Sequence, residues 1–160
     1  MSGPAEGDRA PDFDMPTDGG ARVRLTDLAG KPLVLYFYPK DDTPGCTREA
    51  QEFSSLAAEF ARAGAAVVGV SRDTAKKHDR FKAKYDLNLT LGADEEGLVT
   101  EAYGVWVEKS MYGRKYMGIE RATFLIGPDG RVARVWRKVS VPNHAQEVLD
   151  ALQQLPVKHA

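Results

Sequence analysis

The chain has 160 residues, of which 42% are hydrophobic, and this is enough to bury one core without disulfides or metal ions. Its 22 basic and 23 acidic residues give a formal net charge of -1, which provides no general positive field for nucleic acid or anionic lipid. It contains no run of about 18 apolar residues, so we predict no membrane-spanning helix and no membrane or nucleic-acid partner.

The first predicted elements are a hairpin and a buried strand. Residues 13–24 form two extended pieces around the turn-forming residues 17–20, and residues 26–30 predict a capped turn. Residues 33–38 are a continuous apolar and aromatic run, which is typical of a strand buried on both faces of a sheet. Pro39 ends this strand.

A long helix and a second strand follow the polar loop after Pro39. Residues 47–63 place apolar side chains at three- and four-residue steps, which makes one stripe along a helix. The stripe comprises Ala50, Phe53, Ala57 and Phe60. Gly64 ends the helix, and residues 65–70 predict a second buried strand.

The second half of the chain continues this alternation and ends in a hairpin and a helix. Its predicted elements are helices over residues 74–85, 98–103 and 143–155 and strands over residues 122–126 and 132–137. Pro128, Asp129 and Gly130 suit a tight turn between the two strands, and Asn143 suits the cap of the last helix. This order predicts a thioredoxin-like α/β sandwich, with a central mixed β-sheet flanked by helices, as a single domain over residues 1–160.

Cys46 is the one cysteine of the chain, and its position predicts a reactive thiol. A lone cysteine is by default a small buried hydrophobe. Cys46, however, falls between the end of a buried strand and the first turn of a helix, where ligands bind in open α/β sheets. The free amides and positive dipole of a helix start favour a thiolate. A cation is also required, and Arg48 and Arg121 are the candidates.

Thr43 stands three residues before Cys46, where a thioredoxin-type disulfide carrier has a second cysteine. Its hydroxyl can both donate and accept a hydrogen bond, which suits holding a peroxide oxygen beside the sulfur. Thr43 is also a good helix N-cap, and the two roles are compatible.

The segment Tyr-Phe-Tyr-Pro-Lys-Asp-Asp-Thr-Pro-Gly-Cys-Thr, residues 36–47, resembles the active-site segment of peroxiredoxins. More narrowly, it is similar to the bacterioferritin comigratory protein (PrxQ) subfamily. Residues 7–13 match the opening of that family, residues 104–106 match a later loop, and residues 121–126 match its arginine-bearing strand. The resemblance covers nearly the whole chain.

The resemblance implies a peroxidase that reduces hydrogen peroxide and organic hydroperoxides without a cofactor. Cys46 would be the nucleophile, Thr43 would hydrogen-bond the peroxide, and Pro39 would shield the site from water. Arg121 would hold thiolate and peroxide together, and Glu49 would orient that arginine. The expected peroxide-binding residues are Thr43, Gly45, Cys46, Glu49 and Arg121.

Many relatives carry a second, resolving cysteine five residues after the first, but this chain has Gln51 there. A sulfenic acid on Cys46 must therefore react with an external thiol, such as thioredoxin, glutaredoxin or glutathione. An interchain Cys46–Cys46 disulfide would be awkward from a recessed site. The alternative function is a peroxide sensor or redox partner-binding module that uses the same cysteine.

The remaining residues predict no second site. His78, His144 and His159 are widely spaced, so we expect no metal, and we place His144 on the surface. Residues 105–117 are expected to form a loop near the site entrance. The acidic N-terminus lacks an apolar segment and a single cysteine suits a reducing compartment, so we expect no signal peptide and a cytoplasmic location. The resemblance implies a monomer, since relatives in this subfamily are often monomers, and the sequence leaves no obvious interface stripe once the core is filled.

Overall fold

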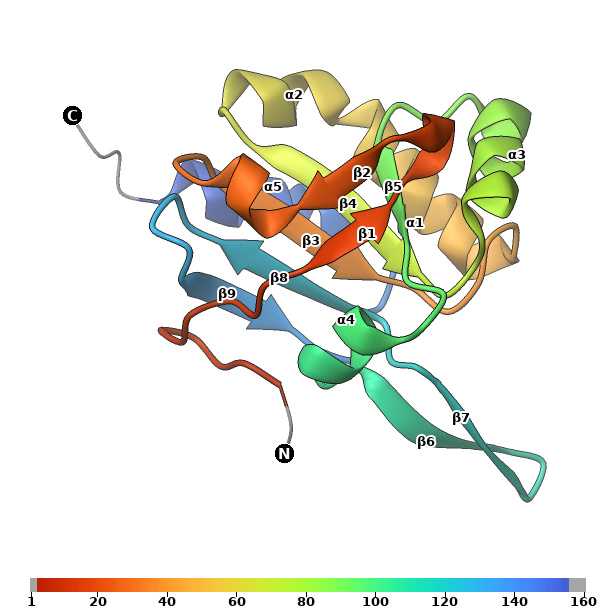
Figure 1. The fold of residues 1–160 in the computed structure, drawn as a ribbon. Helices are drawn as coiled ribbons and strands as arrows, with labels where there is room; N and C mark the ends of the chain where they lie inside the picture. Colours follow the sequence, from red (N-terminus) through yellow and green to blue (C-terminus); the bar gives the residue numbers. More distant parts are fainter. Residues whose placement is uncertain (1–2, 156–160) are drawn as a thin grey trace.

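The computed structural model describes residues 3–155, and within them a five-stranded mixed sheet forms the centre (Figure 1). Its strands are β3 (Leu33–Phe37), β4 (Ala66–Ser71), β5 (Thr90–Ala93), β8 (Ala122–Ile126) and β9 (Val132–Trp136). They lie in the order β5-β4-β3-β8-β9. β3 is buried along its whole length and pairs in parallel with β4 and antiparallel with β8. The mixed sheet is the predicted one.

Each face of the sheet has its own apolar cluster, because successive side chains of a strand point to opposite faces. Leu35 and Phe37 of β3 belong to a cluster that includes Tyr103 and residues of the N-terminal hairpin. Val34 and Tyr36 belong to a second cluster, to which the helices contribute. These helices are α1 (Pro44–Ser55), α2 (Ala57–Arg62), α3 (Ala75–Tyr85) and α5 (His144–Gln153). The short α4 (Leu98–Ala102) leads into Tyr103.

The N-terminal hairpin is confirmed as β1 (Asp14–Pro16) and β2 (Arg22–Arg24), followed by a 3-10 helix over Leu25–Leu28. The predicted helix over residues 47–63 is two helices, because the backbone at Leu56 departs from helical geometry (φ -100°, ψ 10°). The first of them begins three residues earlier than predicted, at Pro44. Proline is well suited to a first helical position, since its fixed φ is helical and its missing N–H has no intrahelical partner there.

The region between α3 and β8 differs from the sequence analysis in two places. Residues 90–93, for which we predicted no element, form the edge strand β5. The segment expected to be a loop is the antiparallel hairpin of β6 (Trp106–Met111) and β7 (Arg114–Ile119), which extends away from the body in Figure 1. Tyr112 and Gly113 both have positive φ, as a tight hairpin turn requires. The hairpin is mostly exposed, so its sequence lacks the apolar alternation that would have revealed it.

Asn143 precedes α5 as predicted but has a left-handed backbone, and its side chain makes no capping bond within residues 3–155. No helix in this described part of the chain combines the length and apolar character required to cross a bilayer.

Candidate active site

Cys46 lies in the first turn of α1, just beyond the carboxyl end of β3. Its side chain is recessed, with the residue 2% exposed, and it packs in the cluster beneath the helices. The backbone N–H of Thr47 makes the first intrahelical bond, to the carbonyl of Thr43 at 2.8 Å. The amides of Gly45 and Cys46 therefore precede the helical ladder, and they present positive partial charge near the sulfur.

Arg121 provides the cation that the sequence called for. Its Nη2 donates a hydrogen bond to Cys46 Sγ at 3.4 Å, although the two residues are 75 positions apart. The pairing of β8 with β3 explains this contact, because Phe37, the last residue of β3, lies opposite Ala122. Arg121 immediately precedes Ala122 and so lies at the same sheet edge as the cysteine. The other candidate, Arg48, is exposed and pairs with Glu52 at 3.1 Å.

Gly45 leaves room for the arginine. A Cβ atom at this position would lie 3.2 Å from Arg121 Nη2, which is tighter than ordinary van der Waals contact. The glycine therefore lets the guanidinium approach the start of α1, where it reaches the thiol.

Glu49 holds the other side of the guanidinium. Its Oε1 accepts a hydrogen bond from Arg121 Nη1 at 2.6 Å, and the residue is 1% exposed. Its Oε2 is buried without a hydrogen-bond partner in the described part of the chain. Burial raises the pKa of Glu49 to about 7, against the opposing effect of Arg121. This carboxyl group thus changes charge near neutral pH.

Thr43 and Pro39 flank the thiol along the chain. Thr43 occupies the N-cap position of α1, but within residues 3–155 its side chain caps no helix amide. Its hydroxyl donates instead to the carbonyl of Lys40 at 2.9 Å, which leaves its lone pairs free to accept. Pro39 is exposed and lines a groove beside the loop. Its shielding role stays a prediction.

A buried ionic network, which the sequence did not reveal, holds the loop before Cys46. His78 of α3 is fully buried between two acceptors, with Nδ1 2.6 Å from Asp41 Oδ2 and Nε2 2.9 Å from the carbonyl of Gly92. Both ring nitrogens must donate, so the ring is an imidazolium. Burial disfavours that charge, but the hydrogen bond to Asp41, the charge of Asp41 and the hydrogen bond to the Gly92 carbonyl together outweigh burial and raise the pKa of His78. Tyr38 donates to the other oxygen of Asp41 at 2.5 Å.

The prediction that His144 lies on the surface is wrong. The residue is 2% exposed, with Nε2 2.7 Å from Thr123 Oγ1 and the ring edge-on to Phe53 and Trp136. Burial and the nearby charge of Arg121 lower its pKa to about 4, so the ring is neutral. The first turn of α5 packs against the sheet, which local sequence does not disclose. His159 lies outside the described residues, and residues 3–155 contain no cluster of histidine, cysteine or acidic side chains suited to a metal.

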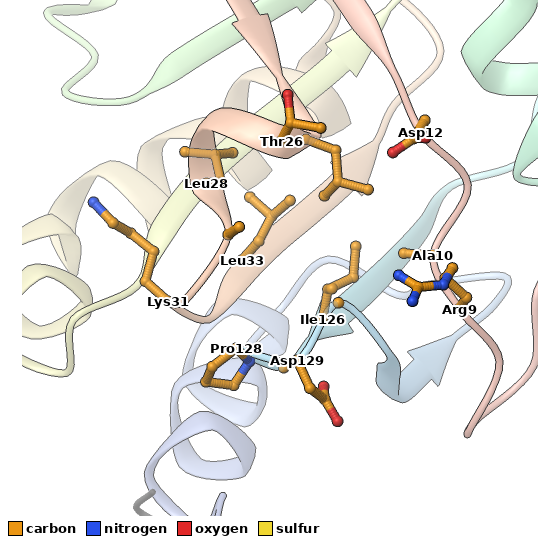
Figure 2. Close-up of a pocket in the computed structure, with 14 residues that line it drawn as sticks. Arg9, Ala10, Asp12, Thr26, Leu28, Lys31, Leu33, Ile126, Pro128 and Asp129 are labelled. Atoms are coloured by element: carbon orange, nitrogen blue, oxygen red, sulfur yellow. The ribbon is translucent and has the colours of Figure 1, made fainter. Parts of the chain in front are cut away.

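A pocket of about 390 Å³ lies at the other end of the sheet (Figure 2). Leu33, the first residue of β3, and Ile126, the last residue of β8, form part of its wall. Figure 2 shows apolar side chains from these strands and charged side chains such as Lys31 and Asp129 around them. The pocket is at the amino end of β3, whereas Cys46 is beyond its carboxyl end, where ligands bind in open sheets.

The fold and the site together define a thioredoxin-fold thiol protein, with a recessed cysteine at a helix start held by an arginine and a buried glutamate. The model of the AhpC/TSA family matches residues 6–135. Peroxiredoxin Bcp of Bacillus subtilis is 47% identical over 152 residues, which cover 95% of this chain and 97% of that protein.

Solved structures agree with this match. The bacterioferritin comigratory protein of Xanthomonas campestris, described for its alkyl peroxide reduction activity, aligns with a TM-score of 0.84 and 47% identity over 88% of this chain and 90% of that chain. A PrxQ mutant of Xylella fastidiosa aligns with a TM-score of 0.91 and 42% identity over 96% and 98% of the two chains. The chain therefore belongs to the peroxiredoxins, as a single-cysteine member of the Bcp/PrxQ group, and is a peroxidase-type enzyme.

Proposed function

We propose that this peroxiredoxin reduces hydrogen peroxide and organic hydroperoxides at Cys46 and is returned to the thiol by an external reductant. The observation that carries the proposal is the hydrogen bond from Arg121 to Cys46 Sγ in a chain with one cysteine. The bond supports a reactive thiolate, and the missing second cysteine supports an intermolecular recycling step.

In the oxidative step, the Cys46 thiolate attacks one oxygen of the peroxide. An S–O bond forms and the O–O bond breaks, so the sulfur is oxidised to a sulfenic acid and the peroxide is reduced to water or an alcohol after taking a proton. Arg121 is placed to stabilise both the thiolate and the charge that develops on the departing oxygen. Thr43 can accept a hydrogen bond from the peroxide O–H, because its own hydrogen is donated to Lys40.

In the reductive step, an external thiol attacks the sulfenic sulfur, and the mixed disulfide forms as water leaves. A second thiol then attacks the disulfide, which releases Cys46 as a thiol and the reductant as a disulfide. Gln51, at the place where many relatives have a resolving cysteine, is exposed on α1 and supplies no sulfur. Thioredoxin, glutaredoxin and glutathione are the candidate reductants. We further propose that the protein works as a monomer in the cytoplasm, which light scattering and fractionation would test.

The test is rapid mixing of the fully reduced protein with one equivalent of hydrogen peroxide. We expect a single turnover of peroxide and a mass gain of one oxygen atom, trapped at Cys46 by a sulfenic-acid reagent. Cys46→Ser should abolish both signals, and a burst that survives in this variant would refute the proposal. Steady-state turnover is then compared for the three reductants. Slow turnover with all of them, together with a stable mixed disulfide to one protein, would favour the sensor function instead.

A further inference from the structure

A groove of about 370 Å³ lies next to the site, at the carboxyl ends of β3 and β4. Three segments form its walls: the loop after β3, the loop after β4 and the base of the β6–β7 hairpin. The lining residues that matter here are Pro39, Lys40, Arg72, Asp73, Trp106, Lys109, Tyr116 and Met117. We call this cavity the hairpin groove. Its place agrees with the rule that ligands bind beyond the carboxyl ends of parallel strands.

The hairpin groove has an excess of positive charge. Lys40 and Lys109 form no ion pair with an acidic side chain of residues 3–155. The one acidic group in the wall, Asp73, is engaged by neighbouring residues: its Oδ2 accepts hydrogen bonds from Ser71 Oγ at 2.7 Å and from the backbone of Asp41 at 2.8 Å, and its Oδ1 lies 4.0 Å from Lys77 Nζ. The wall thus has the positive charges of Lys40, Arg72 and Lys109 against one carboxylate, so an anion that enters the groove meets net positive charge.

The hairpin groove adjoins the two segments that hold the thiol. Thr43 Oγ1 donates to the carbonyl of the lining residue Lys40 at 2.9 Å, and the lining residue Ile119 precedes Arg121 by two positions. Lys109 lies in the same wall and is partly buried, and burial followed by the charge of Arg121 lowers the pKa of its ammonium group, while the charge of Cys46 acts in the opposite direction. Gly118, diagonal to Lys109 on the facing strand, makes this position possible, because a Cβ there would lie 3.2 Å from Lys109 Cδ and 3.4 Å from the Tyr116 ring. The lysine stem thus lies flat over the hairpin.

The walls suit an organic anion rather than a bare ion. The Arg72 guanidinium stacks 3.4 Å from the centre of the Trp106 ring and donates to Thr100 Oγ1 at 3.1 Å, so the wall is rigid there. Tyr116 and Met117 are half-exposed and add apolar surface. The volume of the groove is at the lower end of the range for small-molecule sites, which is about 300–1,000 Å³.

We propose that the hairpin groove binds the carboxylate end of a small anionic thiol, which is the reductant of Cys46. The inference rests on the proposed single-cysteine cycle and specifies its reductant. With the carboxylate held by Lys40 and Lys109, the thiolate of the reductant attacks the sulfenic sulfur. The S–S bond forms, the S–O bond breaks, and the oxygen leaves as water after protonation. Cys46 is reduced from the sulfenic acid, and the sulfur of the reductant is oxidised.

The test isolates the reductive step. Protein oxidised with one equivalent of hydrogen peroxide is mixed with glutathione or mercaptoacetate, which carry carboxylates, and with neutral 2-mercaptoethanol. The readout is the ratio of the anionic to the neutral second-order rate constant. Because exposed ion pairs have modest energies, we expect this ratio to fall about threefold in Lys109→Met and in Lys40→Met, and further in the double variant. Added salt should lower the wild-type ratio towards that of the variants.

Lys115→Met is the matched control, because it removes the same charge from the same hairpin. Lys115 is 74% exposed and does not line the groove, so its loss should leave the ratio close to that of the wild type. An unchanged ratio in Lys109→Met, or an equal fall in Lys115→Met, would overturn the proposal. The proposal would also be overturned if Lys109→Met slowed only the oxidation of Cys46 by a carboxylate-bearing hydroperoxide and left the reductive step unchanged, since the groove would then hold the peroxide. Failure of the proposed function itself appears earlier, as a missing oxidation burst before any thiol is added.

Discussion

Asp41 and Glu49 are two buried carboxylates on either side of Cys46 in the chain, and their surroundings are opposite. Asp41 uses both oxygens, accepting from Tyr38 at 2.5 Å and from the His78 imidazolium at 2.6 Å. Glu49 uses one oxygen for Arg121, and the other has no partner among residues 3–155. A buried charge is stable when it is both paired and fully hydrogen-bonded.

The difference separates two kinds of buried charge at one site. Asp41 and His78 form a complete ion pair that fixes the loop leading to Cys46, so it builds the site. Glu49 is incompletely satisfied, and burial raises its pKa to about 7, so its charge responds to conditions near neutrality. Because Glu49 accepts a hydrogen bond from the guanidinium that contacts the thiol, its protonation changes the charge beside Arg121 and Cys46, whereas the Asp41–His78 pair stays constant.

Breaking the complete pair should have the largest effect. Asp41→Asn leaves the His78 imidazolium buried without a counter-charge, and we expect it to lower the free energy of unfolding by about 3–5 kcal/mol. Urea denaturation measures this change. Asp42→Asn is the matched control, because Asp42 pairs with Lys84 at 2.8 Å at the exposed surface and its loss should cost much less. Equal destabilisation by the two variants would contradict the distinction.

The next effect is a pH dependence of stability due to Glu49. Its pKa rises from 4.5 to about 7 on folding, so the folded chain binds this proton more tightly than the unfolded chain. The associated stability is complete below pH 4.5 and is lost as the pH rises to 7, by up to about 3 kcal/mol. Urea denaturation at several pH values measures this change: between pH 4.5 and 7 the free energy of unfolding of the wild type should fall relative to that of Glu49→Gln by this amount.

Comparison with Glu49→Gln is required because His144 acts in the opposite direction. Its pKa falls from 6.5 to about 4 on folding, so its contribution to stability is lost as the pH drops through this window. That contribution is common to the wild type and the variant and cancels in their difference. Parallel stability curves for the two proteins would show that Glu49 does not titrate in this range.

Tyr38 and Tyr36 allow the same comparison between a bonded and an unbonded buried polar group, with smaller expected changes in stability. Tyr38→Phe removes a donor to Asp41 and should destabilise the protein by about 1.5–3 kcal/mol, as for hydrogen bonds to charged groups. Tyr36→Phe removes a buried hydroxyl that has no partner in the described residues, so it should be neutral or stabilising. Thermal or urea unfolding measures both changes. A larger cost for Tyr36→Phe would mean that its hydroxyl has a role that its contacts do not reveal.

The smallest expected effect concerns rate. Glu49→Gln weakens the hold on Arg121 and should slow Cys46 oxidation roughly tenfold, less than the 10²–10³ typical of removing a donor outright. In the wild type, this rate should rise with pH near 7 as Glu49 ionises and pairs with Arg121. The pH profile of the oxidation rate of Glu49→Gln should lack this rise near pH 7. Glu59→Gln, on α2 and paired with Arg62 at 3.1 Å, is the control and should retain it.

The local part of the site was open to prediction from the sequence. The buried strand ending before Pro39, the helix carrying Cys46 and the tight turn of the β8–β9 hairpin each have a signature within a few residues. Thr43 follows from the same segment, because its hydroxyl suits both the N-cap of a helix and a hydrogen bond beside the sulfur. Arg121 was one of two candidate cations, and the choice between them, like the roles of Gly45 and Glu49, came only through the resemblance to peroxiredoxins.

Tertiary structure decided what surrounds the thiol. Arg121 reaches Cys46 across 75 residues because of the register between β3 and β8, and His78 meets Asp41 across 37 residues. The burial of His144 and the hairpin beside the groove were equally hidden from the sequence. Periodicity and turn chemistry act between near neighbours, whereas a buried charge is neutralised by whichever residue packing brings beside it. The sequence therefore determined the fold and the nucleophile, and packing determined the charges that act on them.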